Sequence, residues 1–224
     1  MPRIWITRSQ PLAEQSAARL LDMGYDAIAA SLIQVKFTPI RLALPENAHL
    51  IFTSRNALRA FALHITERNF PCLCVGDATA KAARGFGFAQ AVSANGNADD
   101  VVAWAQDNIS RDTPIYHIAG NHPRGDIIER LEAFGFSNAQ REIFYNTDIV
   151  SHDPRPFKCG DDIILLYSPL AAKSLISLGL DMEEMGIISI SAAVDAALGD
   201  ISCKSRLIAA RPREDSLLTH LPPL

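Results

Sequence analysis

Five turns in the sequence carry hydroxyl, glycine and arginine residues where they could bind an anionic ligand. Each follows a short apolar run and precedes a segment of helical periodicity. A helix N-terminus has unpaired N–H groups and a partial positive charge, so such turns can hold carboxylates or phosphates. Serine and threonine are also ordinary N-cap residues, so helix capping remains the alternative for each turn. The turns are Thr7-Arg8-Ser9, Thr53-Ser54-Arg55, Gly76-Asp77-Ala78-Thr79, Gly120-Asn121-His122-Pro123-Arg124-Gly125 and Tyr167-Ser168-Pro169.

The elements around these turns are expected to be strands that alternate with helices. Residues 4–7 predict a strand, and residues 11–23 carry apolar side chains on one helical face. The alternation returns in the pairs 50–53 and 57–63, 73–75 and 79–84, and 115–118 and 127–134, and again over 163–178. This pattern predicts parallel sheets buried on both faces. Ligands bind at the carboxyl ends of strands in such sheets, where the five turns lie.

Three of the expected helices end with the same signal, a glycine followed by an aromatic residue. The pairs are Gly24-Tyr25, Gly87-Phe88 and Gly135-Phe136. Glycine adopts a positive φ at little cost, and the aromatic ring can pack back on the last helical turn. The signal predicts left-handed C-terminal caps, which have a structural role only.

A weak internal repeat predicts two similar α/β lobes. Residues 52–57 and 166–171 both read as a strand end, a hydroxyl residue and a helix start, and a second strand-to-helix turn follows each, at 75–80 and 190–195. A chain of 224 residues is long enough for two such lobes.

Composition excludes several classes of partner. The chain is 48% hydrophobic, which predicts a globular protein, and its net charge of −4 argues against a nucleic-acid or anionic-membrane surface. No apolar stretch approaches the roughly 20 residues that cross a bilayer, and the N-terminus has no export leader, so we expect a cytoplasmic protein. An anionic ligand must therefore be bound by a local cluster of residues.

Metal and cofactor signatures are missing. The four cysteines, Cys72, Cys74, Cys159 and Cys203, are expected to be buried thiols in a reducing compartment. Cys72 and Cys74 would share one face of a strand, and their spacing is a poor zinc signature. His117 and His122 also lack the usual spacing of metal ligands. The sequence has no dinucleotide fingerprint, Walker loop, nucleophile elbow or His-Glu-x-x-His motif. We expect no metal and no cofactor. These absences leave a two-lobed binder of an anionic small molecule, or an enzyme that works by holding its substrate's geometry.

Seven stretches, taken in order, resemble one enzyme family along nearly the whole chain. They are residues 6–8, Leu50-Ile51-Phe52-Thr53-Ser54, Val75-Gly76-Asp77-Ala78-Thr79-Ala80, Asn95-Gly96-Asn97-Ala98, residues 119–125, Tyr145-Asn146-Thr147 and Tyr167-Ser168-Pro169. The family is that of the uroporphyrinogen-III synthases. The resemblance implies two flavodoxin-like α/β lobes with parallel sheets, joined by a two-stranded linker, with a cleft between the lobes. Residues 1–36 and 148–224 would form the first lobe, and residues 37–147 the second.

The resemblance also implies the reaction. The substrate would be hydroxymethylbilane, a linear tetrapyrrole with eight carboxylates. It would close to uroporphyrinogen III with loss of water and inversion of the last pyrrole ring through a spiro intermediate, without a cofactor. Tyr145 would assist departure of the hydroxyl group, because a phenol stays protonated at neutral pH. The alternative for Tyr145 is a ring that only packs at the junction of the lobes.

Substrate binding is expected from the five turns. The candidate binding residues are Thr7, Arg8, Thr53, Ser54, Arg55, Gly76, Thr79, Asn121, Arg124 and Ser168. Each basic side chain could instead be a solvated surface charge. The turn at residues 190–195, which corresponds in the other lobe to the turn at 75–80, departs from the family pattern. Val194 stands at the position that corresponds to Thr79, and Ser191 stands where glycine is common.

Two other classes compete with the enzyme. A noncatalytic ligand-binding module or sensor would share the two lobes, and a periplasmic binding protein would close on its ligand but is disfavoured by the missing export signal. We expect a monomer that binds a small molecule, with no nucleic-acid or membrane partner. A transient contact with the preceding enzyme of the pathway is compatible with this expectation.

Overall fold

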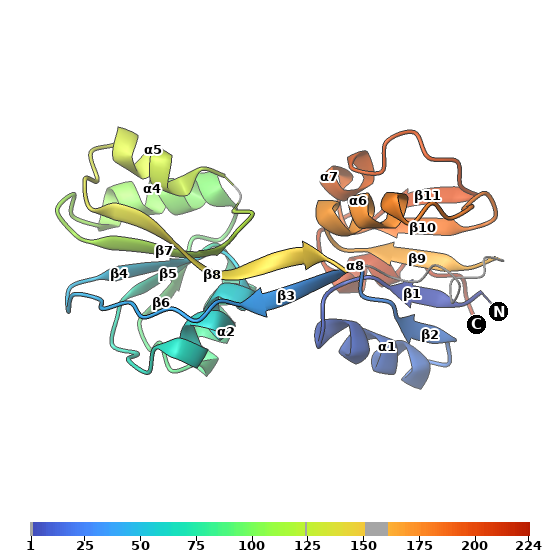
Figure 1. Cartoon of the computed structure of the whole chain (residues 1–224), viewed down its shortest axis with the longest axis horizontal. Coiled ribbons are helices and arrows are strands. Elements are labelled where there is room, and N and C mark those ends of the chain that lie inside the picture. Colours follow the sequence, from blue (N-terminus) through green and yellow to red (C-terminus); the bar gives the residue numbers. More distant parts are fainter. Residues whose placement is uncertain (1, 124, 151–160) are drawn as a thin grey trace. The chain divides into compact units, whose positions relative to one another are not determined.

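The computed structural model describes residues 2–123, 125–150 and 161–224 of the chain. The chain forms two compact units, which we call unit 1 (Met1–Gln34 with Asp148–Leu224) and unit 2 (Val35–Thr147). Each unit contains one sheet with helices packed on both faces (Figure 1). The predicted α/β class with parallel sheets is therefore confirmed.

Unit 1 is built on a five-stranded sheet in the order β11-β10-β9-β1-β2. All four pairings in this sheet are parallel. The strands are β1 (Ile4–Ile6), β2 (Ala27–Ala29), β9 (Ile163–Leu166), β10 (Gly186–Ser189) and β11 (Ser205–Ile208). The helices are α1 (Leu12–Asp22), α6 (Pro169–Ser177), α7 (Ala192–Ala196) and α8 (Glu214–Leu218). The strand order reverses between β1 and β9, as in flavodoxin-like sheets, and ligands of such sheets bind at this reversal point.

Strand β9 explains the continuous apolar run in its sequence. Ile164 and Leu166 pack into the cluster under α6 and α7, whereas Ile163 and Leu165 face the cluster under α1 and α8. Successive side chains of a strand point to opposite faces, so a strand covered on both sides must be apolar at every position.

Unit 2 is built on a six-stranded sheet in the order β3-β8-β7-β4-β5-β6. The strands are β3 (Ile33–Phe37), β4 (His49–Phe52), β5 (Cys72–Cys74), β6 (Ala91–Ser93), β7 (Ile115–Gly120) and β8 (Ala139–Ile149). The helices are α2 (Arg55–His64), α3 (Asp77–Gly85), α4 (Ala98–Asn108) and α5 (Ile127–Ala133). Strands β4 to β8 pair in parallel, and their order reverses between β4 and β7. β3 and β8 contain the two points at which the chain passes from one unit to the other.

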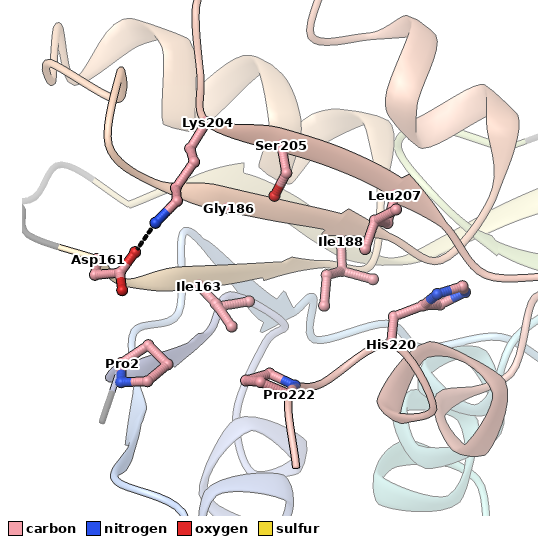
Figure 2. Close-up of a pocket in the computed structure, with 10 residues that line it drawn as sticks. All are labelled: Pro2, Asp161, Ile163, Gly186, Ile188, Lys204, Ser205, Leu207, His220 and Pro222. Atoms are coloured by element: carbon pink, nitrogen blue, oxygen red, sulfur yellow. Dashed lines mark hydrogen bonds and ion pairs between the residues drawn. The ribbon is translucent and has the colours of Figure 1, made fainter.

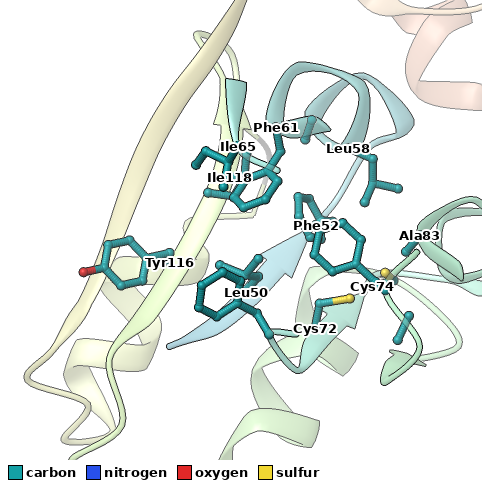
Figure 3. Packing of buried hydrophobic residues seen from close by; sticks show 14 of the residues in the cluster. Leu50, Phe52, Leu58, Phe61, Ile65, Cys72, Cys74, Ala83, Tyr116 and Ile118 are labelled. Carbon is teal, nitrogen blue, oxygen red and sulfur yellow. The ribbon is translucent and has the colours of Figure 1, made fainter. Parts of the chain in front are cut away.

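The core of unit 2 beneath α2 and α3 is aromatic (Figure 3). The ring centroids of Phe52, Phe61 and Phe88 lie 5.5–5.7 Å apart, distances at which aromatic pairs attract one another. Cys72 and Cys74 are fully buried free thiols in the same cluster, as the sequence predicted. Cys203 is partly exposed, so the expected burial is wrong for that residue, and Cys159 lies outside the described residues.

The predicted helix ends are confirmed. Gly24, Gly87 and Gly135 follow α1, α3 and α5 with φ angles of 95°, 95° and 88°. Phe88 and Phe136, which come directly after two of these glycines, are fully buried. The three helices therefore stop where glycine admits the left-handed conformation.

The internal repeat is also visible in the backbone. Ser54 caps α2 with φ −149° and ψ 154°, and Ser168 caps α6 with φ −155° and ψ 152°. In each case the hydroxyl oxygen accepts a hydrogen bond from the backbone N–H three residues on, Ala57 at 3.0 Å and Ala171 at 3.1 Å. The capping interpretation therefore holds for both serines, and it does not preclude a second role.

Candidate functional site

The carboxyl end of β4 brings two hydroxyl residues to the point where the strand order of unit 2 reverses. Thr53 and Ser54 follow β4 directly, and Ser54 is the N-cap of α2. The Ser54 Oγ lies 2.9 Å from the Oη of Tyr145, which belongs to β8. The turn and the tyrosine are 91 residues apart in sequence, and the sheet makes them neighbours.

The backbone of β7 fixes the tyrosine ring from the other side. Gly120, the last residue of β7, is the register partner of Tyr145 at a β-bulge. A Cβ atom at Gly120 would lie 2.5 Å from Cε2 and 2.6 Å from Cζ of the Tyr145 ring. The next residue, Asn121, donates its backbone N–H to the Tyr145 carbonyl at 3.1 Å, and its Oδ1 accepts from the Thr147 N–H at 2.8 Å. Tyr145 is therefore held in a slot that glycine leaves open.

From the sequence, His117 was only a poor candidate for a metal ligand. The structure places its ring beside Thr53. It is fully buried in β7, and its Nε2 lies 3.1 Å from Thr53 Oγ1. Burial, reinforced by the nearby charge of Arg141, lowers the pKa of His117 to about 4, with Glu129 acting in the opposite direction. The imidazole is therefore neutral at pH 7. No sequence signal indicated this contact, because it joins two separate strands.

The N-terminus of α3 is the second feature of unit 2 suited to anions. Its N-cap is Gly76, which has no side chain to bond the first N–H groups of the helix. Thr79 is only 7% exposed, whereas Asp77 and Ala78 of the same turn are exposed. Arg55 is exposed at the start of α2, and Lys81 is exposed in the middle of α3. Arg124 lies outside the described residues.

In unit 1, the candidate residues after β1 are engaged by the unit itself. Thr7 is fully buried and its Oγ1 donates to the Leu165 carbonyl at 2.7 Å. The Arg8 guanidinium forms an ion pair with Glu214 at 2.9 Å and lies 4.6 Å from the centre of the Tyr167 ring. Thr7 and Arg8 thus have internal partners, while Ser168 sits at the end of β9 as the cap of α6.

Glu214 is the centre of a polar cluster that the sequence did not reveal. One oxygen, Oε1, accepts hydrogen bonds from Arg8 at 2.9 Å, Ser16 at 2.5 Å and Tyr167 at 3.0 Å. Burial, followed by the charge of Glu214, raises the pKa of Tyr167. The Tyr167 phenol is therefore a poor source of protons, in contrast to the role expected of Tyr145.

A cavity of about 340 Å³ lies elsewhere in unit 1 (Figure 2). Ile163, Gly186 and Ser205, the first residues of β9, β10 and β11, line it together with the Asp161–Lys204 ion pair. It is thus at the amino ends of the strands, and none of the candidate site residues lines it. The cavity and the candidate residues are separate features of the sheet.

The described part of the chain holds neither a group of metal ligands nor a helix that could span a membrane. Among residues 2–123, 125–150 and 161–224, no three His, Cys, Asp or Glu side chains are grouped as a metal site. Within the same residues, no helix has the length and apolar character needed to cross a membrane.

The polar groups at the carboxyl ends of the unit 2 strands suit one kind of chemistry. They comprise a phenol in contact with a serine hydroxyl, a threonine hydroxyl backed by a neutral histidine, and helix N-termini. Hydroxyl groups and helix N–H groups bind carboxylates, and a phenol can donate a proton to a leaving group. These groups can orient a polycarboxylate and assist departure of a hydroxyl group.

Comparison with known proteins agrees with this chemistry. The model of a protein family described as uroporphyrinogen-III synthase HemD matches residues 14–219. The fold is similar to the crystal structure of uroporphyrinogen-III synthetase from Helicobacter pylori 26695, with 16% identity, a TM-score of 0.68 and coverage of 97% of this chain and 96% of that one. It is also similar to a mutant uroporphyrinogen III synthase from the extremely thermophilic bacterium Thermus thermophilus, with 10% identity, a TM-score of 0.55 and coverage of 98% and 96%. No curated protein sequence matches significantly. Since the family model spans most of the sequence, the chain belongs to the uroporphyrinogen-III synthase family, whose members are cyclising lyases of tetrapyrrole biosynthesis.

Proposed function

We propose that the chain cyclises hydroxymethylbilane at the carboxyl ends of the unit 2 strands, with Tyr145 assisting departure of the terminal hydroxyl group. The observation that carries this proposal is the 2.9 Å contact between the Tyr145 and Ser54 hydroxyl groups, at the point where the strand order reverses. Ligands of open α/β sheets bind at such points. Gly120 leaves the space that the ring occupies.

The reaction begins when a pyrrole nitrogen of the substrate expels the hydroxyl group. The phenol of Tyr145 supplies the proton with which this group leaves as water, so that a phenolate remains and the substrate becomes an electrophilic azafulvenium cation. The substituted carbon of the last ring then attacks, forming a spiro intermediate that fragments and closes again with that ring inverted. The proton finally lost from pyrrole carbon restores the phenol, so the protein is unchanged.

Product choice depends on position more than on acid strength. Spontaneous closure joins the free end of the last ring, so the protein must hold the first and last rings in the less accessible geometry. Well-oriented intramolecular reactions reach effective molarities of about 10⁵–10⁸ M, which is large enough to redirect the closure. We expect Thr53 and the N-termini of α2 and α3 to bind carboxylates for this purpose.

The first test is the identity of the product. Purified protein is given freshly generated hydroxymethylbilane without added cofactor, the products are oxidised, and the type I and type III uroporphyrin isomers are separated. Predominant type III supports the proposal. Type I alone, formed at the uncatalysed rate by folded protein, would refute it and favour a noncatalytic binding module.

The second test is Tyr145→Phe. We expect it to lower type III turnover severalfold while the protein remains folded, because only the phenolic hydroxyl group is lost. Tyr116→Phe is the matched control, since Tyr116 is a buried tyrosine of β7 whose ring packs in the apolar core. Full activity of Tyr145→Phe would remove the catalytic role of Tyr145.

We also propose that the protein acts as a cytoplasmic monomer that meets the preceding enzyme of the pathway only transiently. The buried free thiols of Cys72 and Cys74 support a reducing compartment. The chain's own helices cover both faces of each sheet, which supports the monomer. Sedimentation of the purified protein over a range of concentrations tests the oligomeric state directly.

A further inference from the structure

His117 touches the proposed site through one residue. Its ring is fully buried in β7, and its Nε2 lies 3.1 Å from the Oγ1 of Thr53. Thr53 is partly exposed and directly precedes Ser54, whose hydroxyl group contacts Tyr145. His117 is thus placed behind the hydroxyl group of Thr53, on the side away from solvent.

Neutral imidazole has two tautomers, and they use the Thr53 hydroxyl group in opposite ways. With the proton on Nδ1, Thr53 must donate its hydrogen to Nε2, and the buried Nδ1–H has no acceptor among the described residues. With the proton on Nε2, the ring donates to Thr53, and Nδ1 is left as an acceptor without a donor. Either tautomer leaves one buried ring nitrogen unpaired at a desolvation cost, so the charges around the ring decide between the two.

The surroundings of the ring favour the tautomer protonated at Nε2. Arg141 is the register partner of His117 across β7 and β8, and its buried Nε–H has no acceptor among the described residues. Its positive charge acts on the imidazole more strongly than the negative charge of Glu129, with which Arg141 pairs at 2.7 Å. A nearby cation stabilises the bare lone pair of Nδ1 and disfavours an N–H at that position.

We propose that His117 is a positioning residue that donates its Nε2–H to Thr53, so that the Thr53 hydroxyl group keeps its own hydrogen for a substrate carboxylate. The Thr53 oxygen then accepts the hydrogen bond from His117, and the Thr53 O–H is left to donate a hydrogen bond to the ligand. A site built in this way selects an anionic acceptor over a donor. This role rests on the proposed function, because it needs Thr53 at the surface that binds the substrate.

The tautomer is tested without any activity measurement. The two ring nitrogens of neutral histidine have distinct ¹⁵N shifts, so ¹⁵N-labelled protein at pH 7 reports where the proton is. The His117 signals are assigned by their loss in His117→Gln. Protonation at Nε2 is expected, and protonation at Nδ1 would overturn the proposal.

The function of the contact is tested by kinetics with four variants. His117→Met removes the donor, His117→Gln keeps an amide N–H near the position of Nε2, and His117→Asn places its amide near Nδ1 instead. We expect His117→Met and His117→Asn to raise KM for hydroxymethylbilane by about tenfold, the size of one hydrogen bond to a charged group, with a smaller change in kcat. His117→Gln should retain most of the wild-type KM. His49→Met is the matched control, because His49 is a half-buried histidine at the first position of β4, whose ring lies near Trp104 and outside the site.

Thr53→Val decides whether His117 acts through Thr53. Thr53→Val alone should raise KM by a similar factor, and His117→Met added to it should change KM less than twofold. Independent multiplication of the two effects would overturn the proposal, as would equal KM values for the Gln and Asn variants. Thermal unfolding of every variant separates these effects from loss of fold. A wild-type protein that makes no type III product would refute the proposed function instead, and the NMR result would still decide the tautomer.

Discussion

Replacing Gly120 by alanine should displace the Tyr145 ring from its slot. The added Cβ would lie 2.5 Å from Cε2 and 2.6 Å from Cζ of that ring. Carbon atoms in contact are normally about 3.5–4.0 Å apart, so the ring must move by about 1 Å. Gly120 does not have a positive φ, so the substitution is a test of space and not of backbone strain.

The size of the effect follows from this displacement. Overpacking of a filled site costs about 1–3 kcal/mol, which we expect as the loss in free energy of unfolding. The Ser54 and Tyr145 oxygens are 2.9 Å apart, and their hydrogen bond is lost if the displaced ring carries the tyrosine oxygen about 1 Å farther from the serine. Type III turnover should therefore fall at least as far as in Tyr145→Phe, although the phenol itself is retained.

Urea unfolding and the isomer assay measure the two consequences. Gly85→Ala is the matched control, because Gly85 is within α3 and a Cβ there has no heavy atom within 4 Å. We expect that control to keep full activity and to gain less than about 1 kcal/mol of stability, because Gly85 is the last residue of α3 and the preference for alanine over glycine is full only in a helix interior.

A double variant can refute the reasoning. In a Tyr145→Ala background the ring is absent, so Gly120→Ala should cost less than about 0.5 kcal/mol. An equal cost of Gly120→Ala in both backgrounds would show that the ring is not what the new methyl group meets. Wild-type turnover in Gly120→Ala would likewise contradict the importance of the ring position.

Two further predictions concern the remaining polar clusters. His117 has a pKa lowered to about 4 in the folded protein from 6.5, so the unfolded chain binds a proton first as the pH falls. Stability from this residue is complete above pH 6.5 and is lost between pH 6.5 and 4, by at most about 3 kcal/mol. Urea unfolding at pH 7 and 4.5 should show a smaller loss in His117→Met, and an unchanged loss would contradict the burial of a neutral ring. In unit 1, Glu214→Ala should lower the free energy of unfolding by about 3 kcal/mol, because Arg8 and two other donors lose their shared acceptor. Glu214→Gln keeps an acceptor and should lose clearly less, and equal losses would rule out this explanation.

Features of the sequence that act over a few residues were predicted well. The three glycine caps and the two serine caps depend on backbone conformation within one turn, so their residue types are sufficient to indicate them. The same is true of α4, whose Asn97 and Asp100 form a capping box. That signal is also local, because the side chains of the N-cap residue and of the third helical residue bond each other's backbone N–H groups.

Contacts between distant segments were not predicted. Thr7 and Arg8 were correctly placed after the first strand, yet the sequence did not indicate that Leu165 and Glu214 would engage them. Arg8 and Glu214 are 206 residues apart, and neither residue type specifies its partner. Substrate binding by Thr7 and Arg8 remains a prediction. It now requires that these internal contacts break, or that a substrate carboxylate binds beside them.

The sequence by itself determined the alternation of strands and helices, the ends of the helices and the family. These follow from hydrophobic period, from turn chemistry and from the order of short motifs, all of which are local. Only the tertiary structure decided that Tyr145 meets Ser54 and that His117 meets Thr53, contacts that span 91 and 64 residues. The physical reason is that strand order and register bring these side chains together, and both are set by how the whole sheet buries its two faces.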